Sequence, residues 1–370
     1  MIEAKTVTST IADGKVTLRI ERRTLPSPAA GEVIVAMEAA SFNPSDQFML
    51  LGTARLDAPM ESGSPADDSL SFELAGDWGQ MFRARLGEAL SLGNEGAGRV
   101  VAAGAGAEGL VGRNVAVFGT GLYATHYLAL AKDCVPLPDD VSTLEASALF
   151  VNPLTALVML EASKAGGHRG IVQTAAASTL GQMVLRVCRE DAIPLVNIVR
   201  GEEQSRLLES LGAKYVVNSA MPDFRETLSN ALEQTRATVA FDAIGGGDLA
   251  DAILNAMEIS ESARETGYRP YGSQTLKQLY VYGGLDPRPT ILSRTYGVRW
   301  SIGGFFLLDQ LAKLGEAKRA ELIGRALSGV KTTFATHFAG TFSLNDMLDP
   351  ATLIAATRRA TGEKYALLFT

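Results

Sequence analysis

The sequence contains little cysteine and little histidine. Two cysteines, Cys134 and Cys188, and three histidines, His126, His168 and His337, lie far apart in a chain of 370 residues. Two distant cysteines exclude a disulfide framework within this chain and also a four-cysteine zinc site. Such low cysteine usage is typical of proteins in a reducing compartment, so we expect a cytoplasmic protein.

Long apolar runs and an excess of positive charge are also lacking. No run approaches the roughly 18 apolar residues that indicate a membrane span. Residues 1–23 contain no cationic region followed by an apolar stretch, so we expect no signal peptide and no membrane association. Lys and Arg number 34 against 41 Asp and Glu, a net charge of −7 that argues against a nucleic-acid partner.

What is present is an ordinary globular composition. Hydrophobic residues make up 46% of the chain and charged residues 20%, which is close to the usage of folded soluble domains. A chain of 370 residues is longer than one hydrophobic core normally supports. We therefore expect two domains.

The first part of the chain, residues 1–150, is rich in strand patterns. Short β-rich runs at residues 16–26, 31–43, 96–105 and 114–119 are separated by glycine and proline. This pattern predicts a compact, mostly antiparallel β domain.

One segment, residues 57–90, interrupts these strands. Its first half is polar, and its second half, residues 78–90, has the composition of a short helix. A surface insertion is one interpretation. A lid or a wall of the substrate site is the other, because long insertions often carry function.

The pattern changes near residue 147, after which strands and helices alternate. Expected strands at 170–175, 194–199, 215–218, 238–244 and 278–284 alternate with expected helices at 179–191, 202–212, 223–234 and 249–258. This alternation predicts a doubly wound parallel sheet in a domain of residues 151–300. Residues 301–370, with a helix at 308–329 and strands at 332–343 and 364–369, are expected to complete the first domain.

The turn between the first parallel strand and its helix, residues 173–181, has the small residues that a dinucleotide loop needs. There, backbone N–H groups at a helix N-terminus approach the pyrophosphate. Only the last glycine of the usual pattern, Gly181, is present, and Ala176 and Ser178 stand where glycines are commoner. The alternative is a close-packed turn that binds no ligand.

The next strand distinguishes between cofactors. NAD enzymes usually carry an acid at its end, where the carboxylate binds the ribose 2′-hydroxyl. Here Arg200 takes that place and is suited to a 2′-phosphate, while Glu202 and Glu203 belong to the first turn of the following helix. We therefore predict NADP(H) as the cofactor; the alternative is that Arg200 is merely solvated.

Several short motifs occur in the order typical of one family. They are Asn-Pro-Ser-Asp at 43–46, Gly-Asn-Glu-Gly-Ala-Gly at 93–98, Tyr-Ala at 123–124, Asn-Pro-Leu-Thr-Ala at 152–156 and the small-residue loop. Together they resemble the medium-chain dehydrogenase/reductases over nearly the whole chain except residues 57–90. Within that superfamily the sequence resembles the quinone oxidoreductases and the 2-enoyl-thioester reductases. The resemblance implies a Rossmann domain inserted into a GroES-like β domain.

Zinc-binding members of this superfamily use a cysteine near position 43 and a histidine in a Gly-His-Glu motif. This sequence has Asn43 and Asn94 at those positions. Neutral amides are poor zinc ligands, so we expect a site without metal.

The resemblance also implies roles for individual residues. It places the pyrophosphate on Ala177, Ser178, Thr179 and Leu180, with Gly181 allowing close packing of the helix, and the 2′-phosphate on Arg200. It places Asn152 and Thr155 beside the nicotinamide, and it places near the cofactor Tyr282, Gly283, Gly284, Leu285, Phe305, Phe306, Leu307 and Lys364. For Phe305 and Phe306, core packing is the alternative.

The expected reaction is hydride transfer from NADPH to an electron-poor small molecule. Without zinc, hydrogen-bond donors must meet the developing negative charge; Asn43 is the expected donor and Asp46 its orienting residue. Asp46 could instead only stabilise the loop.

The choice of substrate depends on Ala54. The enoyl-thioester reductases carry a tyrosine at the position of Ala54 that resembles a proton donor, so a quinone or a conjugated carbonyl is the expected substrate. The alternatives are 2-enoyl-thioester reduction and a non-catalytic NADPH-binding protein. A homodimer that pairs along residues 299–306 is also expected.

Overall fold

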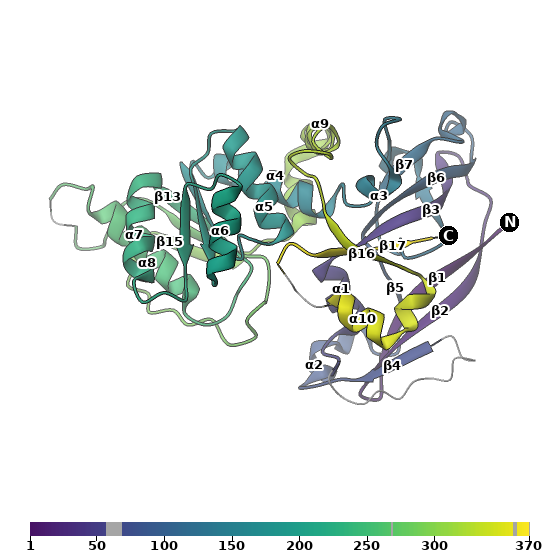
Figure 1. The fold of residues 1–370 in the computed structure, drawn as a ribbon, viewed down its shortest axis with the longest axis horizontal. Coiled ribbons are helices and arrows are strands. Elements are labelled where there is room, and N and C mark those ends of the chain that lie inside the picture. Colours follow the sequence, from purple (N-terminus) through teal and green to yellow (C-terminus); the bar gives the residue numbers. More distant parts are fainter. Residues whose placement is uncertain (57–68, 268, 358–360, 370) are drawn as a thin grey trace. The chain divides into compact units, whose positions relative to one another are not determined.

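The computed structural model describes residues 1–56, 69–267, 269–357 and 361–369 (Figure 1). Contacts divide the chain into two units. Unit 1 consists of Met1–Val151 and Ala326–Thr370, and unit 2 is Asn152–Arg325. One unit is therefore inserted into the other along the sequence, as predicted.

Unit 2 is built on a six-stranded parallel sheet. Its strand order is β12-β11-β10-β13-β14-β15, and the order reverses between β10 and β13. This is the arrangement of the Rossmann fold, in which the carboxyl ends of the two central strands face the ligand. The strands are β10 (Gly170–Gln173), β11 (Leu195–Val199), β12 (Tyr215–Asn218), β13 (Ala237–Asp242), β14 (Lys277–Val281) and β15 (Trp300–Gly304).

Helices cover this sheet because their apolar side chains recur at helical spacing. Val172, Val196 and Ile198 share a core with apolar residues of α7 and α8. Alternate residues of the same strands point to the opposite face of the sheet. The helices are α4 (Val151–Ala165), α5 (Thr179–Glu190), α6 (Glu202–Ser210), α7 (Phe224–Thr235), α8 (Leu249–Ser262) and α9 (Leu307–Ser328).

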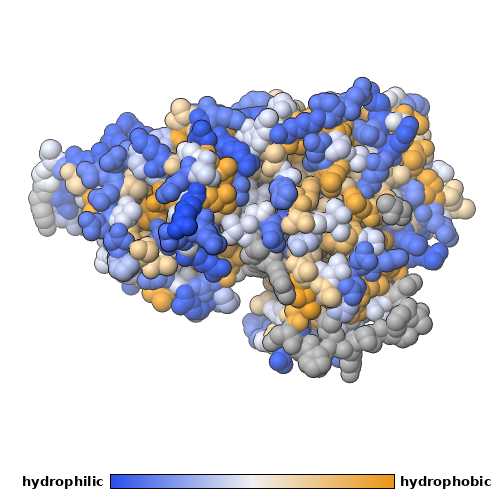
Figure 2. Space-filling model, viewed as in Figure 1, coloured by the Kyte–Doolittle hydropathy of each residue, from blue (hydrophilic) through white to orange (hydrophobic). Residues whose placement is uncertain are grey.

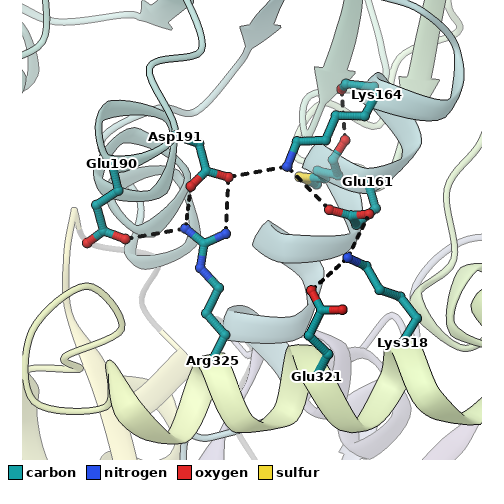
Figure 3. A network of polar contacts seen from close by, with 9 residues as sticks. Glu161, Lys164, Glu190, Asp191, Lys318, Glu321 and Arg325 are labelled. Carbon is teal, nitrogen blue, oxygen red and sulfur yellow. Dashed lines mark hydrogen bonds and ion pairs between the residues drawn. The ribbon is translucent and has the colours of Figure 1, made fainter.

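The second boundary between the units lies at residues 325/326, and not at 300/301 as expected. Two observations explain the difference. Strand β15 pairs in parallel with β14, and α9 is joined to α4 and α5 by ion pairs (Figure 3). Arg325 lies 2.7 Å from Asp191, and Lys318 lies 3.3 Å from Glu161. Residues 301–325 therefore belong to the Rossmann unit.

Unit 1 is built from two sheets. A four-stranded antiparallel sheet has the order β4-β2-β1-β5, and a seven-stranded sheet has the order β16-β17-β3-β6-β7-β9, with β8 paired to β3. Only β16 and β17 pair in parallel among the strands described in this unit. The strands are β1 (Ile2–Ala12), β2 (Lys15–Leu25), β3 (Glu32–Phe42), β4 (Ser69–Glu73), β5 (Leu90–Ser91), β6 (Glu95–Ala103), β7 (Asn114–Phe118), β8 (His126–Leu130), β9 (Cys134–Pro136), β16 (Phe338–Ser343) and β17 (Lys364–Leu368).

Short helices and turns connect these strands. They are α1 (Pro44–Leu51), α2 (Trp78–Met81), α3 (Thr143–Ala146) and α10 (Pro350–Thr357), together with the 3₁₀ turns η2 (Arg83–Arg85), η3 (Glu108–Leu110), η4 (Ala131–Asp133) and η5 (Asn345–Leu348). One apolar core lies between β1, β2, β3, β4 and α1, and a second lies under β6, β7 and β8.

The expected insertion at 57–90 falls partly outside the described residues, which resume at residue 69. From there the chain is part of the domain. Strand β4 pairs with β2, and Phe72 and Phe82 are buried in the first core of unit 1. The helix expected at 78–90 is limited to α2 and η2. A surface insertion therefore does not describe residues 69–90.

None of the helices in the described ranges is long and apolar enough to cross a membrane. On the face drawn in Figure 2, hydrophilic residues predominate over the Rossmann unit, at the left of the view.

Candidate functional site

The small-residue loop of unit 2 lies between β10 and α5. Ser178 is the N-cap of α5, and its Oγ accepts a hydrogen bond of 3.1 Å from the N–H of Gly181. A Cβ at position 181 would lie 2.3 Å from the carbonyl oxygen of Ala176. Only glycine fits there, and its absence of a side chain brings the helix against the loop, as the sequence predicted.

Three backbone N–H groups at this turn are free to bind an anion. Those of Ala177, Thr179 and Leu180 meet no acceptor in the part of the chain that the structure describes. They sit at the positive end of the α5 dipole. Unpaired N–H groups at a helix N-terminus form a ready anion site, so this loop can accept a phosphate group.

Arg200 follows β11 directly and is exposed. Its backbone N–H donates to Gln204 Oε1 at 3.2 Å, but its guanidinium has no ion-pair partner within the described ranges. Glu202 instead pairs with Arg206 on α6, and Glu202 and Glu203 occupy the first turn of that helix, as expected. The guanidinium of Arg200 is therefore available to an anion.

A buried hydrogen-bond network joins the ends of β10 and β13, where the strand order reverses. Thr174 Oγ1 donates to Asp242 Oδ1 at 2.7 Å and accepts from the N–H of Ala243 at 2.8 Å. Asp242 Oδ2 accepts from the N–H of Gly245 at 3.1 Å. The two loops beside the expected ligand position are thus fixed to each other. Sequence reasoning missed this pair, although an acid ending an apolar strand was a usable signal.

The other cofactor residues expected in unit 2 lie at strand and helix ends. Asn152 and Thr155 are partly exposed in the first turn of α4. Tyr282 follows β14, and its N–H donates to the carbonyl of Asp242 at 2.9 Å. Burial, and then the charge of Asp242, raise the pKa of the Tyr282 hydroxyl well above its usual value. Gly283, Gly284 and Leu285 continue this segment, and the N–H of Leu285 donates to Ala243 at 3.1 Å.

The aromatic pair after β15 divides into one buried and one exposed ring. Phe305 is 7% exposed and packs edge-on against Phe241 and Tyr280, with ring centroids 5.2 and 5.4 Å away. Phe306 is 57% exposed, and Leu307 begins α9. Phe305 is therefore a core residue in this structure, while Phe306 is accessible.

In unit 1, the start of α1 positions Asn43 and Asp46. Asn43 is the N-cap and Pro44 the first helical residue, where its fixed φ and missing N–H suit a helix. The carboxylate of Asp46 accepts a 2.9 Å hydrogen bond from the backbone N–H of Asn43. Both side chains are fully or almost fully buried. Asp46 therefore fixes the start of α1, which is compatible with both roles considered for it.

Asp46 also accepts hydrogen bonds from two side chains of other segments. Asn94 Nδ2 donates to Oδ1, and the hydroxyl of Tyr123 donates to Oδ2 at 2.9 Å. Gly93, at φ +95°, lets the Tyr123 ring approach, because a Cβ there would lie 2.5 Å from Tyr123 Cδ1. Burial raises the pKa of Asp46 to about 6 despite these hydrogen bonds.

Glu95 is the residue of this cluster that sequence reasoning missed. Its Oε1 accepts from Asn43 Nδ2 at 3.0 Å and lies 3.5 Å from Lys364 Nζ. Its Oε2 accepts from the N–H groups of Phe150 and Val151, at 2.8 and 2.9 Å, where α4 begins. A charged residue at the start of the apolar, glycine-rich run 95–103 was the signal that could have revealed it.

The structure therefore brings together, in unit 1, three residues that the sequence singled out for function: Asn43, Asp46 and Lys364. It adds Asn94, Glu95 and Tyr123. In this six-residue cluster Asn94 alone is more than slightly exposed. No group of three or more His, Cys, Asp or Glu side chains in the described ranges is placed to hold a metal ion. Burial raises the pKa of the thiols of Cys134 and Cys188 to about 12.

Comparison with known proteins finds relatives along most of the chain. No family model matches. The mitochondrial enoyl-[acyl-carrier-protein] reductase of Xenopus tropicalis is 27% identical over 329 residues, which cover 83% of this chain and 77% of that protein. The alignments with the bovine and human enzymes of the same name span about half the length of those relatives.

Solved structures match this chain over nearly its whole length. A putative NADPH:quinone reductase from Mesorhizobium loti superposes with a TM-score of 0.70 at 25% identity, covering 99% of this chain and 98% of that one. The Escherichia coli quinone oxidoreductase complexed with NADPH also gives a TM-score of 0.70, at 19% identity, covering 98% and 99% of the two chains.

A Rossmann unit inserted into a GroES-like β unit defines the medium-chain dehydrogenase/reductase fold, so the predicted fold class is confirmed. The relatives are enoyl reductases and quinone reductases, which are consistent with the zinc-independent branch. The family resemblance that the motifs predicted is confirmed.

Proposed function

We propose that this protein is an NADP(H)-dependent reductase that works without a metal ion. In unit 2, three N–H groups at the N-terminus of α5 have no acceptor among the described residues, and Arg200, not an acid, follows the next strand. This pair of features carries the proposal. Structural relatives named as NADPH:quinone reductases and as complexed with NADPH support it.

The residues present fit this cofactor. The N–H groups of Ala177, Thr179 and Leu180 would hold the pyrophosphate, with Ser178 capping the helix behind them, and Arg200 would hold the 2′-phosphate. The other proposed contacts are Asn152, Thr155, Gly181, the segment Tyr282, Gly283, Gly284 and Leu285, and the pair Phe306 and Leu307, which follows the core residue Phe305. When bound, the cofactor supplies a hydride to an electron-poor carbon.

We propose that the catalytic side chains belong to the polar cluster of unit 1. Asn43 is fixed by Glu95, and Asp46 is fixed by Asn43 and Tyr123. Asn43 was the expected donor, but it is fully buried and donates to Glu95, so we propose that it positions its neighbours instead. Asn94 is held by Asp46 and is partly exposed, so we propose it as the donor to a substrate oxygen.

A quinone or a conjugated carbonyl is the substrate class that we propose. Ala54 forms a bridge with Leu74 and carries only a methyl group, so it cannot protonate an enolate. A quinone product spreads its negative charge and takes its proton from water. The second candidate is 2-enoyl-thioester reduction, which the similarity to enoyl-[acyl-carrier-protein] reductases favours.

A turnover panel tests these assignments. NADPH oxidation is followed with a small quinone, an enone and crotonyl-CoA, and we expect the thioester to be the slowest substrate. If the thioester reacts fastest, another group supplies the proton and the second candidate is correct. If none of the three is reduced although NADPH binds, the protein is a non-catalytic NADPH-binding protein.

Two further proposals concern metal and assembly. The purified protein should hold no stoichiometric zinc, and a chelator should leave turnover unchanged; zinc at one per chain, lost together with activity, would contradict this.

Strand β15 is the edge of the parallel sheet, and Trp300 to Ile302 are partly exposed along it. We propose a homodimer paired along this edge, which light scattering would refute by returning the mass of one chain.

A further inference from the structure

Two amide side chains are buried inside the parallel strands of the Rossmann unit. Gln173 in β10 is 2% exposed and Asn197 in β11 is fully buried. Their neighbours Val172, Val196 and Ile198 pack toward α7 and α8, so the two amides point to the opposite face of the sheet. Buried amides are unfavourable unless they are hydrogen-bonded, so their partners show what they hold in place.

The two amides form one chain of hydrogen bonds. Gln173 and Asn197 are paired in register on adjacent strands. Gln173 Nε2 donates to Asn197 Oδ1 at 2.8 Å and to the carbonyl oxygen of Gly181 at 2.9 Å. Asn197 Nδ2 in turn donates to the carbonyl oxygen of Tyr215 at 3.1 Å. The chain therefore runs from the first turn of α5 across β10 and β11 to β12.

This chain of hydrogen bonds joins the two places proposed to bind phosphate groups. Gly181 belongs to the helix turn whose N–H groups are proposed to hold the pyrophosphate, and Asn197 lies three residues before Arg200. We infer that Gln173 and Asn197 are positioning residues that fix the distance between the α5 N-terminus and Arg200, and so set the preference for NADPH over NADH.

The physical reason is that NADPH uses two anion sites at once and NADH uses one. A second anion site increases the affinity for a bound molecule only when both sites are held at the correct spacing. Loosening α5 against β11 therefore weakens NADPH more than NADH. The inference rests on the proposed NADP(H) dependence and adds a means by which the fold sets cofactor choice.

The test is calorimetric titration of NADPH and NADH into the wild type, Gln173→Met, Arg200→Ala and the double variant. Methionine matches the length of glutamine but makes none of its hydrogen bonds. We expect Gln173→Met to lower the ratio of Kd for NADH to Kd for NADPH by about fivefold or more. In the Arg200→Ala background the same substitution should leave the ratio unchanged, because the second anchor is already gone.

Thr235→Val is the matched control. Thr235 is buried in the same unit, and its Oγ1 donates to the carbonyl of Ala231 at 2.8 Å, at the end of α7. It should lower the melting temperature without changing the cofactor ratio. If Gln173→Met does not fold, Asn197→Leu removes the acceptor of the same hydrogen bond and replaces it in the series.

The outcomes separate the two proposals. Equal Kd values for NADPH and NADH in the wild type would overturn the proposed cofactor specificity, and the inference with it. A wild type that prefers NADPH, with a folded Gln173→Met or Asn197→Leu variant that keeps the wild-type ratio within twofold, would overturn the inference alone. An equal fall of the ratio in Thr235→Val would show a general effect of instability and also overturn it.

Discussion

Two buried carboxylates, one in each unit, are held in opposite ways. Asp46 in unit 1 accepts hydrogen bonds from Asn43, Asn94 and Tyr123, and it has no ion pair among the described residues. Glu258 in unit 2 contacts the ammonium of Lys277, which is fully buried. Burial raises the pKa of Asp46 to about 6. Burial acts in the same direction on Glu258, but Lys277 and its other donors more than offset it and lower its pKa to about 2.

The difference between the two carboxylates indicates that Glu258 has a structural role and that Asp46 belongs to the candidate site. Glu258 also accepts from the N–H and the hydroxyl of Ser273, each at 2.7 Å, so every polar atom of the pair is satisfied at the start of β14. Asp46 instead remains close to titration at neutral pH, as is common for groups in functional sites. A buried charge without a counterion lowers stability, and proteins keep such groups where chemistry requires them.

The largest effect should follow from breaking the Glu258 pair. Lys277→Met removes the cation and leaves a buried carboxylate without its partner, which should lower the free energy of unfolding by about 3–5 kcal/mol. Chemical denaturation at pH 7 measures it. The double variant Lys277→Met/Glu258→Leu should recover much of the loss, because it removes the unpaired charge. A loss below about 1 kcal/mol in the single variant would show that the pair is not a scaffold.

The stability that Asp46 contributes should increase as the pH falls. The pKa of Asp46 is raised from 3.8 to about 6 on folding, so the folded chain binds the proton more tightly. The stabilisation of the folded state by protonated Asp46 is fully present below pH 3.8 and is lost as the pH rises through about 6. The stability of the wild type relative to Asp46→Asn should therefore increase by about 2 kcal/mol between pH 7 and pH 4.5. A difference that does not change over this window would contradict the raised pKa.

The smallest effect should come from the ion pairs that join α9 to α4 and α5. Arg325 is a third exposed, and its partners Asp191 and Glu190 lie at the end of α5 (Figure 3). Exposed pairs contribute little, so Arg325→Gln should lower stability by about 1 kcal/mol or less, with the effect shrinking at high salt. Thermal melts at low and high salt measure it. A larger loss of stability that does not depend on salt would show that this network behaves like the buried Glu258–Lys277 pair.

The sequence predicted those features that depend on local pattern. The alternation of strands and helices after residue 147 predicted the parallel sheet, and the small residues before Gly181 predicted the turn before α5. Both depend on local features, namely the spacing of apolar residues and the residue types in the turn. The pattern did not show that β15 and α9 extend the Rossmann unit, because that depends on pairing with β14 and on ion pairs across helices. Most of the buried network also remained hidden. Glu95 meets Asn43, Phe150 and Lys364 from distant segments, and no spacing rule connects them.

We propose above all that unit 2 binds NADP(H) and recognises its 2′-phosphate through Arg200. Equilibrium titration of NADPH and NADH into the wild type and Arg200→Ala tests it most directly. We expect the wild type to bind NADPH more tightly than NADH. Arg200→Ala should weaken NADPH binding and so reduce the difference in binding free energy between the two cofactors by about 1.5–3 kcal/mol, the range for hydrogen bonds to charged groups. Equal affinity for the two cofactors in the wild type, or a preference for NADPH that survives the loss of Arg200, would contradict the claim.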